Sequence, residues 1–272
     1  LLTIITRISD AGKLREAGKM RSYLRAAYGA AIKARRQASA LPALRDLRLQ
    51  SNPARDLEPL EGGTGGTRER ALSLSELRAY WRRLATLPGT DGALLRFHLL
   101  TGGQRVRQLS RLVTADFDAD MQAIRLRDPK GKRKEPRIHV VPMIPAALQA
   151  LKLMTAPNLG PHLFSVDGGE SGASYFLIHS RIRSVVEAMA EAGELEKGPF
   201  TAGDVRRTVE TRLAGAGISQ GVRAQLQSHG LSGVQARHYD QHDYLAEKRA
   251  ALETLYRLVT GDAATVVPIK RA

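Results

Sequence analysis

The stretch at residues 121–141 reads Met121-Gln-Ala-Ile-Arg-Leu-Arg-Asp-Pro-Lys-Gly-Lys-Arg-Lys-Glu-Pro-Arg-Ile-His-Val-Val141, and here the hydrophobic pattern of the chain changes its period. Both ends of the stretch carry apolar residues at alternate positions, as strands do. At the second end, Ile138 and Val140 alternate with Arg137 and His139. The pattern predicts two strands that pair as an antiparallel β-hairpin.

The turn between the two predicted strands is strongly basic. It reads Asp128-Pro-Lys-Gly-Lys-Arg-Lys-Glu-Pro136, in which two prolines and a glycine interrupt the strand pattern. Any polar turn would close a hairpin, so four Lys or Arg side chains at its tip favour contact with phosphate. We expect Lys132, Arg133 and Lys134 to bind a nucleic-acid backbone.

Most of the remaining chain has helical spacing. Near the N-terminus, apolar residues recur every three or four positions from Met20 through Leu24, Ala27 and Tyr28 to Ala31. Further helices are predicted over residues 73–84, 91–101, 178–189, 204–214, 219–227 and 243–259, with another start near residue 104. The fold class is therefore mainly α with a small antiparallel β-hairpin or sheet, an α+β fold.

One glycine-rich segment divides the chain. Residues 62–72 begin Gly-Gly-Thr-Gly-Gly-Thr, a composition that forms neither a stable helix nor a strand. Directly after it, Ser73 and Glu76 match the S-x-x-E capping box of a helix start. These signals predict a helical domain over residues 1–61, a linker over 62–72, a second domain over 73–260 and a C-terminal tail over 261–272. We also expect the chain to be truncated at its N-terminus, because it opens on Leu1 and not on Met.

The net charge points to a polyanionic partner. The 272 residues include 42 Lys or Arg and 27 Asp or Glu, which gives a formal net charge of +15. Basic surfaces of this kind bind nucleic-acid phosphates, although solubility alone would also account for some excess charge. The absence of cysteine excludes a disulfide scaffold, a thiolate metal site and a cysteine nucleophile. The sequence also has no apolar run near the roughly 18 residues of a membrane span, so we expect no membrane partner.

The sequence has no phosphate-binding glycine loop, no dinucleotide fingerprint and no metal-ligand motif, so phosphate chemistry would depend on side chains alone. Two predicted helix starts carry an arginine, Arg105 after Thr101-Gly-Gly-Gln and Arg206 after Phe200-Thr-Ala-Gly-Asp-Val. Downstream come Ser228-His229-Gly230 and then Tyr239. Each of these is ordinary when taken singly, since an arginine at a helix start is usually a surface residue and a tyrosine on an amphipathic helix usually lies in the core. Their order and spacing are what carry information.

In that order, the chain resembles the tyrosine recombinase, or phage integrase, family. Thr101-Gly-Gly-Gln-Arg-Val-Arg-Gln-Leu109 is similar to the family's first arginine box, and Gly203-Asp-Val-Arg-Arg-Thr208 is similar to its second. Gln227-Ser-His229 matches the later L-G-H box, and Gly233-Val-Gln-Ala-Arg-His-Tyr239 the segment of the nucleophile. Together with Glu247-Lys-Arg-Ala-Ala-Leu252, this last segment most resembles integrases of satellite phages and genomic islands. The resemblance implies a helical core-binding domain followed by a catalytic domain.

The chain departs from the family pattern at three places. Gly203 stands where the second box usually has histidine, and Gln108 replaces the usual acid after the first arginine. The spacing from His229 to Tyr239 is ten residues, one longer than is usual in the family. Tyr244, at a spacing of fifteen, is therefore a competing choice of nucleophile.

The resemblance implies DNA cleavage and rejoining through a 3′-phosphotyrosyl intermediate, with no cofactor and no metal. Tyr239 would be the nucleophile, and Arg105, Arg206 and His229 would contact the phosphate oxygens. Lys130, the family's hairpin lysine, would protonate the leaving 5′-oxygen. Further contacts with the DNA backbone are expected from basic side chains outside this set, namely Arg21, Arg25, Arg35, Arg36 and Arg207.

The implied partner is double-stranded DNA at attachment sites, bound by a homo-tetramer and assisted by accessory DNA-bending or excisionase proteins. The implied role is integration or excision of a phage-derived mobile element, in the cytoplasm of a bacterium and associated with its nucleoid. Three alternatives stay open: a DNA-binding protein of the same fold with lost or weakened catalysis, an enzyme with type IB topoisomerase-like activity, and a basic helical scaffold for RNA. Aromatic residues make up only 5% of the chain, which disfavours the RNA scaffold.

Overall fold

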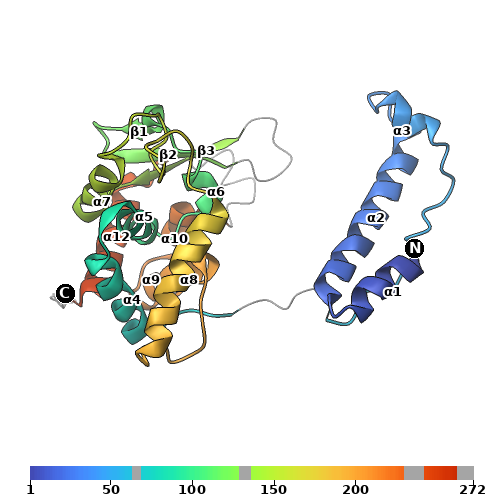
Figure 1. Ribbon diagram of the computed structural model, residues 1–272. Helices are drawn as coiled ribbons and strands as arrows, with labels where there is room; N and C mark the ends of the chain where they lie inside the picture. Colours follow the sequence, from blue (N-terminus) through green and yellow to red (C-terminus); the bar gives the residue numbers. More distant parts are fainter. Residues whose placement is uncertain (63–68, 129–135, 230–241, 262–272) are drawn as a thin grey trace, which may run out of the picture. The chain divides into compact units, whose positions relative to one another are not determined.

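The computed structural model describes residues 1–62, 69–128, 136–229 and 242–261 (Figure 1). The chain divides into two compact units, Leu1–Arg68 and Glu69–Ala272. Arg70 and Leu72, which fall inside the predicted linker, are held in the C-terminal unit. Arg70 forms an ion pair with Glu76 at 2.5 Å, and the backbone N–H of Leu72 donates to Thr208 at 2.9 Å.

The N-terminal unit is a small helical assembly. It contains helices α1 (Leu2–Asp10), α2 (Leu14–Ala34) and α3 (Pro42–Asp46), and α1 packs along α2 (Figure 1). The helix predicted around Met20–Ala31 is confirmed, but its apolar face is only partly covered, since Met20 is 36% exposed. Over the described residues 1–62, the buried apolar side chains other than Ile5 are alanines.

The C-terminal unit is mainly helical with one small sheet, as the sequence predicts. The capping box at Ser73 is confirmed: its hydroxyl accepts from the N–H of Glu76, whose carboxylate accepts from the N–H of Ser73. The helices are α4 (Leu74–Thr86), α5 (Gly89–Leu100), α6 (Val106–Leu109), α7 (Pro145–Thr155), α8 (Tyr175–Glu191), α9 (Ala202–Gly215), α10 (Gln220–Gln227) and α12 (Leu245–Thr260), with a 3₁₀ turn at Thr114–Asp116.

The sheet has three antiparallel strands in the order β1-β2-β3. The hairpin predicted from residues 121–141 is confirmed as β2 (Ala123–Asp128) paired with β3 (Arg137–Pro142), in a register that places Leu126 opposite His139. The third strand, β1 (Phe117–Asp118), was not predicted. It contains only two residues, too few to show an alternating pattern.

The inward face of β3 differs from the alternation in the sequence. The pattern treats Ile138 and Val140 as the apolar face, yet Ile138 is 51% exposed while His139 is 1% exposed. His139 is accommodated because its Nε2 donates to the carbonyl oxygen of Leu226 at 3.0 Å. Burial, followed by the nearby charges of Lys248 and Arg137, lowers the pKa of His139 to about 3, so the imidazole is neutral at physiological pH.

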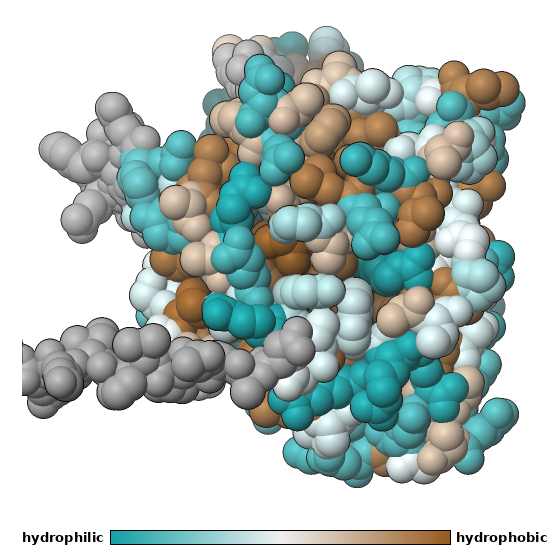
Figure 2. Space-filling view, turned by 90° about the vertical axis from the view of Figure 1, so that its left-hand side faces the viewer, coloured by the Kyte–Doolittle hydropathy of each residue, from teal (hydrophilic) through white to brown (hydrophobic). Residues whose placement is uncertain are grey.

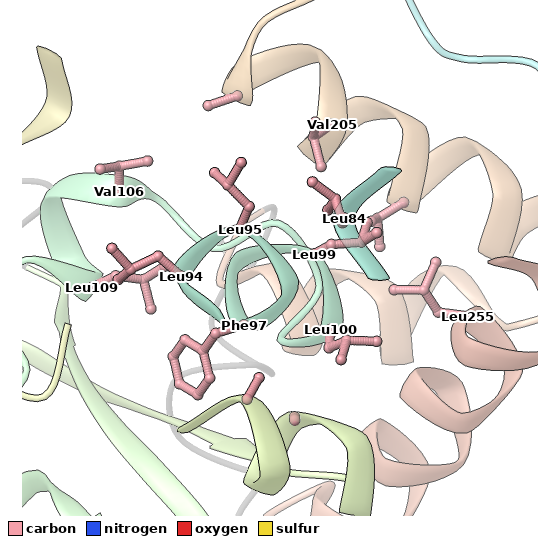
Figure 3. Close-up of a cluster of buried hydrophobic side chains, with 14 of the residues drawn as sticks. Leu84, Leu94, Leu95, Phe97, Leu99, Leu100, Val106, Leu109, Val205 and Leu255 are labelled. Atoms are coloured by element: carbon pink, nitrogen blue, oxygen red, sulfur yellow. The ribbon is translucent and has the colours of Figure 1, made fainter. Parts of the chain in front are cut away.

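Helix α5 lies at the centre of the hydrophobic core. Leucines on all its sides are fully buried, and Figure 3 shows Leu95, Phe97 and Leu99 pointing from α5 in different directions. Helices α4, α7, α8 and α12 pack against it. A helix that is apolar all round must lie inside the fold, and this one therefore fixes the turn that follows it, where the first arginine is found.

A hollow lies between α7 and α12 of this unit. The hollow has a volume of about 490 Å³ and is lined by Ile144, Pro145 and Tyr256, among others. Figure 2 shows this side of the molecule, where apolar residues in brown lie among polar ones in teal. Among the described helices, none is both long enough and apolar enough to cross a membrane.

Candidate active site

Arg105 is placed by a tight turn between α5 and α6. Gly102 and Gly103 in this turn have φ angles of 88° and 63°, values that L side chains rarely adopt. A Cβ on Gly103 would lie 2.9 Å from the Cα of Arg206, so only glycine lets the turn approach α9 this closely. The turn therefore brings the two arginine boxes, about a hundred residues apart, into contact.

Arg206 lies in the first turns of α9 and is held by three acceptors from two other segments. Its guanidinium donates to the carbonyl of Gly103 at 3.3 Å, to Gln104 Oε1 at 3.4 Å and to the carbonyl of Gln227. Gln227 in turn donates to the carbonyl of Arg206 at 2.9 Å. Because these contacts come from the α5–α6 turn and the end of α10, the position of Arg206 is set by tertiary structure.

Arg105 is close enough to Arg206 to affect the pKa of Arg206. Burial first, and then the charge of Arg105, lower the pKa of Arg206 to about 10. Arg206 thus remains protonated at neutral pH, and two like charges share one site. A hollow of about 250 Å³ lies beside them, lined by Gly103, Arg105, Tyr175, Gly203 and Arg206 together with neighbouring residues. Two cations held together beside a hollow form a site for an anion.

His229 lies just beyond the end of α10, two residues after Gln227, whose carbonyl accepts from Arg206. Helix α10 ends at Ser228, whose φ of 46° turns the chain sharply, and the N–H of His229 bonds back to Ala224 at 3.1 Å. The ring Nε2 of His229 lies 3.1 Å from Gln227 Oε1 and 3.7 Å from Glu210 Oε2. The side chain is 39% exposed.

Asp128 is a residue of this site that the sequence pattern did not single out. It ends β2, and its Oδ2 lies 3.7 Å from Arg105 Nη1 and accepts a hydrogen bond of 3.0 Å from the Ser228 hydroxyl. The sequence signal for it is weak: Asp128 is an acid at the end of a predicted strand, directly before a run of mostly basic residues. The four basic residues that follow dominate the charge of the turn, so the sequence pattern alone assigns no role to this acid.

The two substituted family positions have different surroundings. Gln108 is buried, and neither atom of its amide group has a hydrogen-bond partner among the described residues. Gly203 is exposed in the first turn of α9, where an added Cβ would meet only Thr201 Oγ1, at 3.7 Å. The structure thus has room for a side chain at residue 203, where the sequence has glycine.

Several predicted site residues lie outside the described residues, namely Tyr239, Lys130, Lys132, Arg133 and Lys134. The competing tyrosine, Tyr244, is described. It precedes α12 with a φ of 56°, is partly buried, and its ring contacts that of His242 at a centroid distance of 4.6 Å.

The arginines predicted to bind the DNA backbone fall into two groups. Three of them make contacts within the fold: Arg21 with Leu57 O at 2.6 Å, Arg35 with Leu49 O at 3.4 Å, and Arg207 with Asp204 at 2.5 Å. Arg25 and Arg36 are exposed. Among the residues that the structure describes, no group of three or more His, Asp or Glu side chains could hold a metal ion.

Comparisons with known proteins identify the fold. No family model matches the sequence, and neither does any curated protein. Solved structures do match. The Tn1549 transposon integrase (residues 82–397), in complex with circular intermediate DNA, superposes with a TM-score of 0.61 at 17% identity. That match covers 91% of this chain and 82% of the integrase chain.

A lambda integrase dimer (residues 75–356) bound to a COC′ core site is similar to a comparable degree. Its TM-score is 0.57 at 17% identity, and the match covers 89% of this chain and 80% of that one. A lambda integrase tetramer bound to a Holliday junction matches with a TM-score of 0.53 at 18% identity, over 89% of this chain and 63% of that one. The mainly helical fold with its small antiparallel sheet is therefore that of the tyrosine recombinase integrases.

Proposed function

We propose that this protein is a site-specific DNA recombinase that cleaves and rejoins DNA through a covalent phosphotyrosyl intermediate. The observation that carries the proposal is that Arg105 and Arg206 line one hollow, while His229 lies within hydrogen-bond distance of Gln227, whose carbonyl accepts from Arg206. Two guanidinium groups repel each other, so holding them together costs free energy that a bound phosphate would offset. The shared fold with DNA-bound integrases supports DNA as the source of that phosphate.

In the proposed reaction, the phenolate oxygen of Tyr239 attacks the scissile phosphorus. A 3′-phosphotyrosyl bond forms, the bond to the 5′-oxygen breaks, and Lys130 donates a proton to that leaving oxygen. Attack by a 5′-hydroxyl of a second strand reverses the step. The bond energy stays in the phosphotyrosyl ester, so the reaction needs no nucleotide cofactor.

Negative charge develops on the non-bridging phosphate oxygens during attack, and the cationic groups would stabilise it. Arg105 and Arg206 each offer a planar set of donors, and His229 adds a third. A free tyrosine has a pKa of about 10, so the same positive charge would also favour the phenolate form of Tyr239.

The finer proposals follow from the family resemblance. The substrate would be double-stranded DNA at the attachment sites of a phage-derived mobile element of the satellite-phage or genomic-island type. The active assembly would be a homo-tetramer on two duplexes, aided by accessory DNA-bending or excisionase proteins. The reaction would take place in the bacterial cytoplasm, at the nucleoid.

The test is covalent capture on a nicked suicide substrate. Wild-type protein is expected to form a protein–DNA adduct, and Tyr239→Phe to form none while binding the same DNA with unchanged affinity. Tyr244→Phe is the matched control and should still form the adduct. An adduct that persists in Tyr239→Phe and disappears in Tyr244→Phe would move the nucleophile to Tyr244.

A second candidate function is DNA binding without catalysis. The exposed Gly203, which brings no imidazole to the site, and the uncharged Gln108 favour it. The same experiment separates the two candidates, because a binding protein retards the DNA in a native gel but leaves no adduct after denaturation. Relaxation of supercoiled plasmid without preference for a site would instead indicate type IB topoisomerase-like activity.

A further inference from the structure

We propose that Asp128 is the positioning residue of the arginine pair: its carboxylate holds Arg105 in place and ties it to the segment that carries His229. The inference rests on the proposed function, because it assigns a role within that same site. The carboxylate of Asp128 lies close to Arg105 and also acts on the charge of Arg206.

The position of Asp128 is fixed by the sheet. It is the last residue of β2, pairs in register with Arg137 of β3, and is 7% exposed. From there its Oδ2 faces two other segments at once, Arg105 Nη1 at 3.7 Å and Ser228 Oγ at 3.0 Å. One carboxylate thus connects the end of β2, the α5–α6 turn and the end of α10.

The charges around Asp128 explain why a carboxylate belongs there. The positive charge of Arg105 lowers the pKa of Arg206, and the negative charge of Asp128 raises it. Glu210 also acts favourably on Arg206, but it is paired with Arg223 at 2.8 Å. Among the described residues, Asp128 is the carboxylate that forms an ion pair with Arg105.

The contact with Arg105 leaves donors for a ligand. At 3.7 Å the Nη1···Oδ2 separation is an ion pair but exceeds hydrogen-bond length. Arg105 Nη1 is buried and has no hydrogen-bond partner among the described residues. A buried donor without a partner is costly, and here the Asp128 charge orients it while its N–H remains available for a phosphate oxygen. Asp128 would therefore position Arg105 without competing for its hydrogen bonds.

Two substitutions separate the charge of Asp128 from its hydrogen bond. Asp128→Asn removes the charge but keeps an oxygen that can accept from Ser228. Ser228→Gly removes the hydroxyl but keeps the charge, and glycine tolerates the φ of 46° at this position. Asp118→Asn is the matched control, because Asp118 also forms an ion pair with an arginine of the sheet, Arg125.

The measurement is the rate of covalent adduct formation at saturating DNA, with DNA affinity and melting temperature recorded for each variant. Asp128→Asn is expected to slow adduct formation at least about tenfold with DNA affinity within about twofold of wild type, because one preorganised donor is misplaced. Ser228→Gly should slow it less, Asp128→Glu should recover part of the rate, and Asp118→Asn should leave it unchanged.

Two results would overturn the inference. One is an unchanged or faster rate in Asp128→Asn, since a faster rate would mean that the carboxylate opposes phosphate binding. The other is a slower rate accompanied by an equal drop in DNA affinity, or matched by Asp118→Asn, which would indicate a general structural role.

A second readout is independent of catalysis. Rotation of the Arg105 guanidinium group, followed by ¹⁵N NMR on the free protein and assigned with Arg105→Lys, should be hindered in wild type and faster in Asp128→Asn. If wild-type protein forms no adduct, the proposed function fails while this interaction can still be present. If the adduct forms and the rotation does not change, the positioning role alone fails.

Discussion

The two units of the chain bury their apolar residues very differently. In the C-terminal unit a continuous cluster of Leu, Val, Ile, Met and Phe side chains surrounds α5 (Figure 3). Among residues 1–62 of the N-terminal unit, the buried apolar residues are Ile5 and four alanines, while Tyr23, Leu41 and Leu47 are more than half exposed. Tight packing holds side chains in one arrangement, so the C-terminal unit can fix a site to within ångströms. The N-terminal unit has few buried side chains, so most of its side chains lie on the surface.

The arginines of the two units follow the same division. Arg206 donates to three acceptors from two segments, and Arg105 pairs with Asp128 and lines the hollow. Arg25 and Arg36, by contrast, are exposed on or beside α2. Positioned arginines suit chemistry on a single phosphate, whereas exposed ones suit diffuse attraction to a backbone. Variants of each unit can therefore test one side of this contrast.

The largest expected effect is on the stability of the core. Leu95→Ala removes a fully buried side chain of α5 and should lower the free energy of unfolding by about 2–5 kcal/mol. Met20→Ala is the control in the N-terminal unit and should change stability by no more than about 0.5 kcal/mol, because the residue is exposed. Urea unfolding followed by circular dichroism measures both. Equal effects would show that the two units are packed alike.

The next effect is on catalysis. Arg206→Ala should reduce the rate of adduct formation about a hundred- to a thousand-fold while DNA binding is largely retained, because the missing donors act on the charge that develops during attack. Arg181→Ala removes an equal charge from a partly exposed ion pair with Asp91 and should leave the rate unchanged. Similar decreases in the rate of adduct formation in both variants would mean that Arg206 acts only through its contribution to the net positive charge.

A smaller effect concerns acid stability. Because the pKa of His139 is about 3 in the folded chain, against a usual value near 6.5, the unfolded chain binds a proton first as the pH falls. The contribution of neutral His139 to the free energy of unfolding is therefore fully present above pH 6.5. It is lost progressively toward pH 3, with a loss of about 2 kcal/mol by pH 5.

His139→Gln keeps a donor that can reach Leu226 O and removes the titration, so its stability should fall less between pH 7 and pH 5 than that of wild type. Melting temperatures at the two pH values provide the comparison. Identical pH dependence in His139→Gln and wild type would mean that His139 is protonated inside the folded protein.

The sequence predicted those features that depend on local order. The hairpin, the capping box at Ser73 and the helix around Met20–Ala31 follow from spacing and turn residues, and all three are confirmed. The buried face of β3 could not be predicted, because the fit of His139 depends on a carbonyl about ninety residues away. The role of Asp128 could not be predicted for the same reason, since its partners come from two distant segments.

The smallest expected effect is on DNA affinity through the N-terminal unit. Replacing Arg25 and Arg36 with alanine together should weaken DNA binding only a few-fold near physiological salt, since each bound phosphate contributes modestly there. It should also lower the slope of log affinity against log salt by about 0.9 for each phosphate that the variant no longer neutralises. The rate of adduct formation at saturating DNA should not change, because neither side chain belongs to the arginine pair. Binding titrations at several salt concentrations measure the slope, with Arg206→Ala for comparison. If the slope is unaltered in the double variant, these arginines are solvated surface residues, and the positive charge that attracts DNA is on the C-terminal unit.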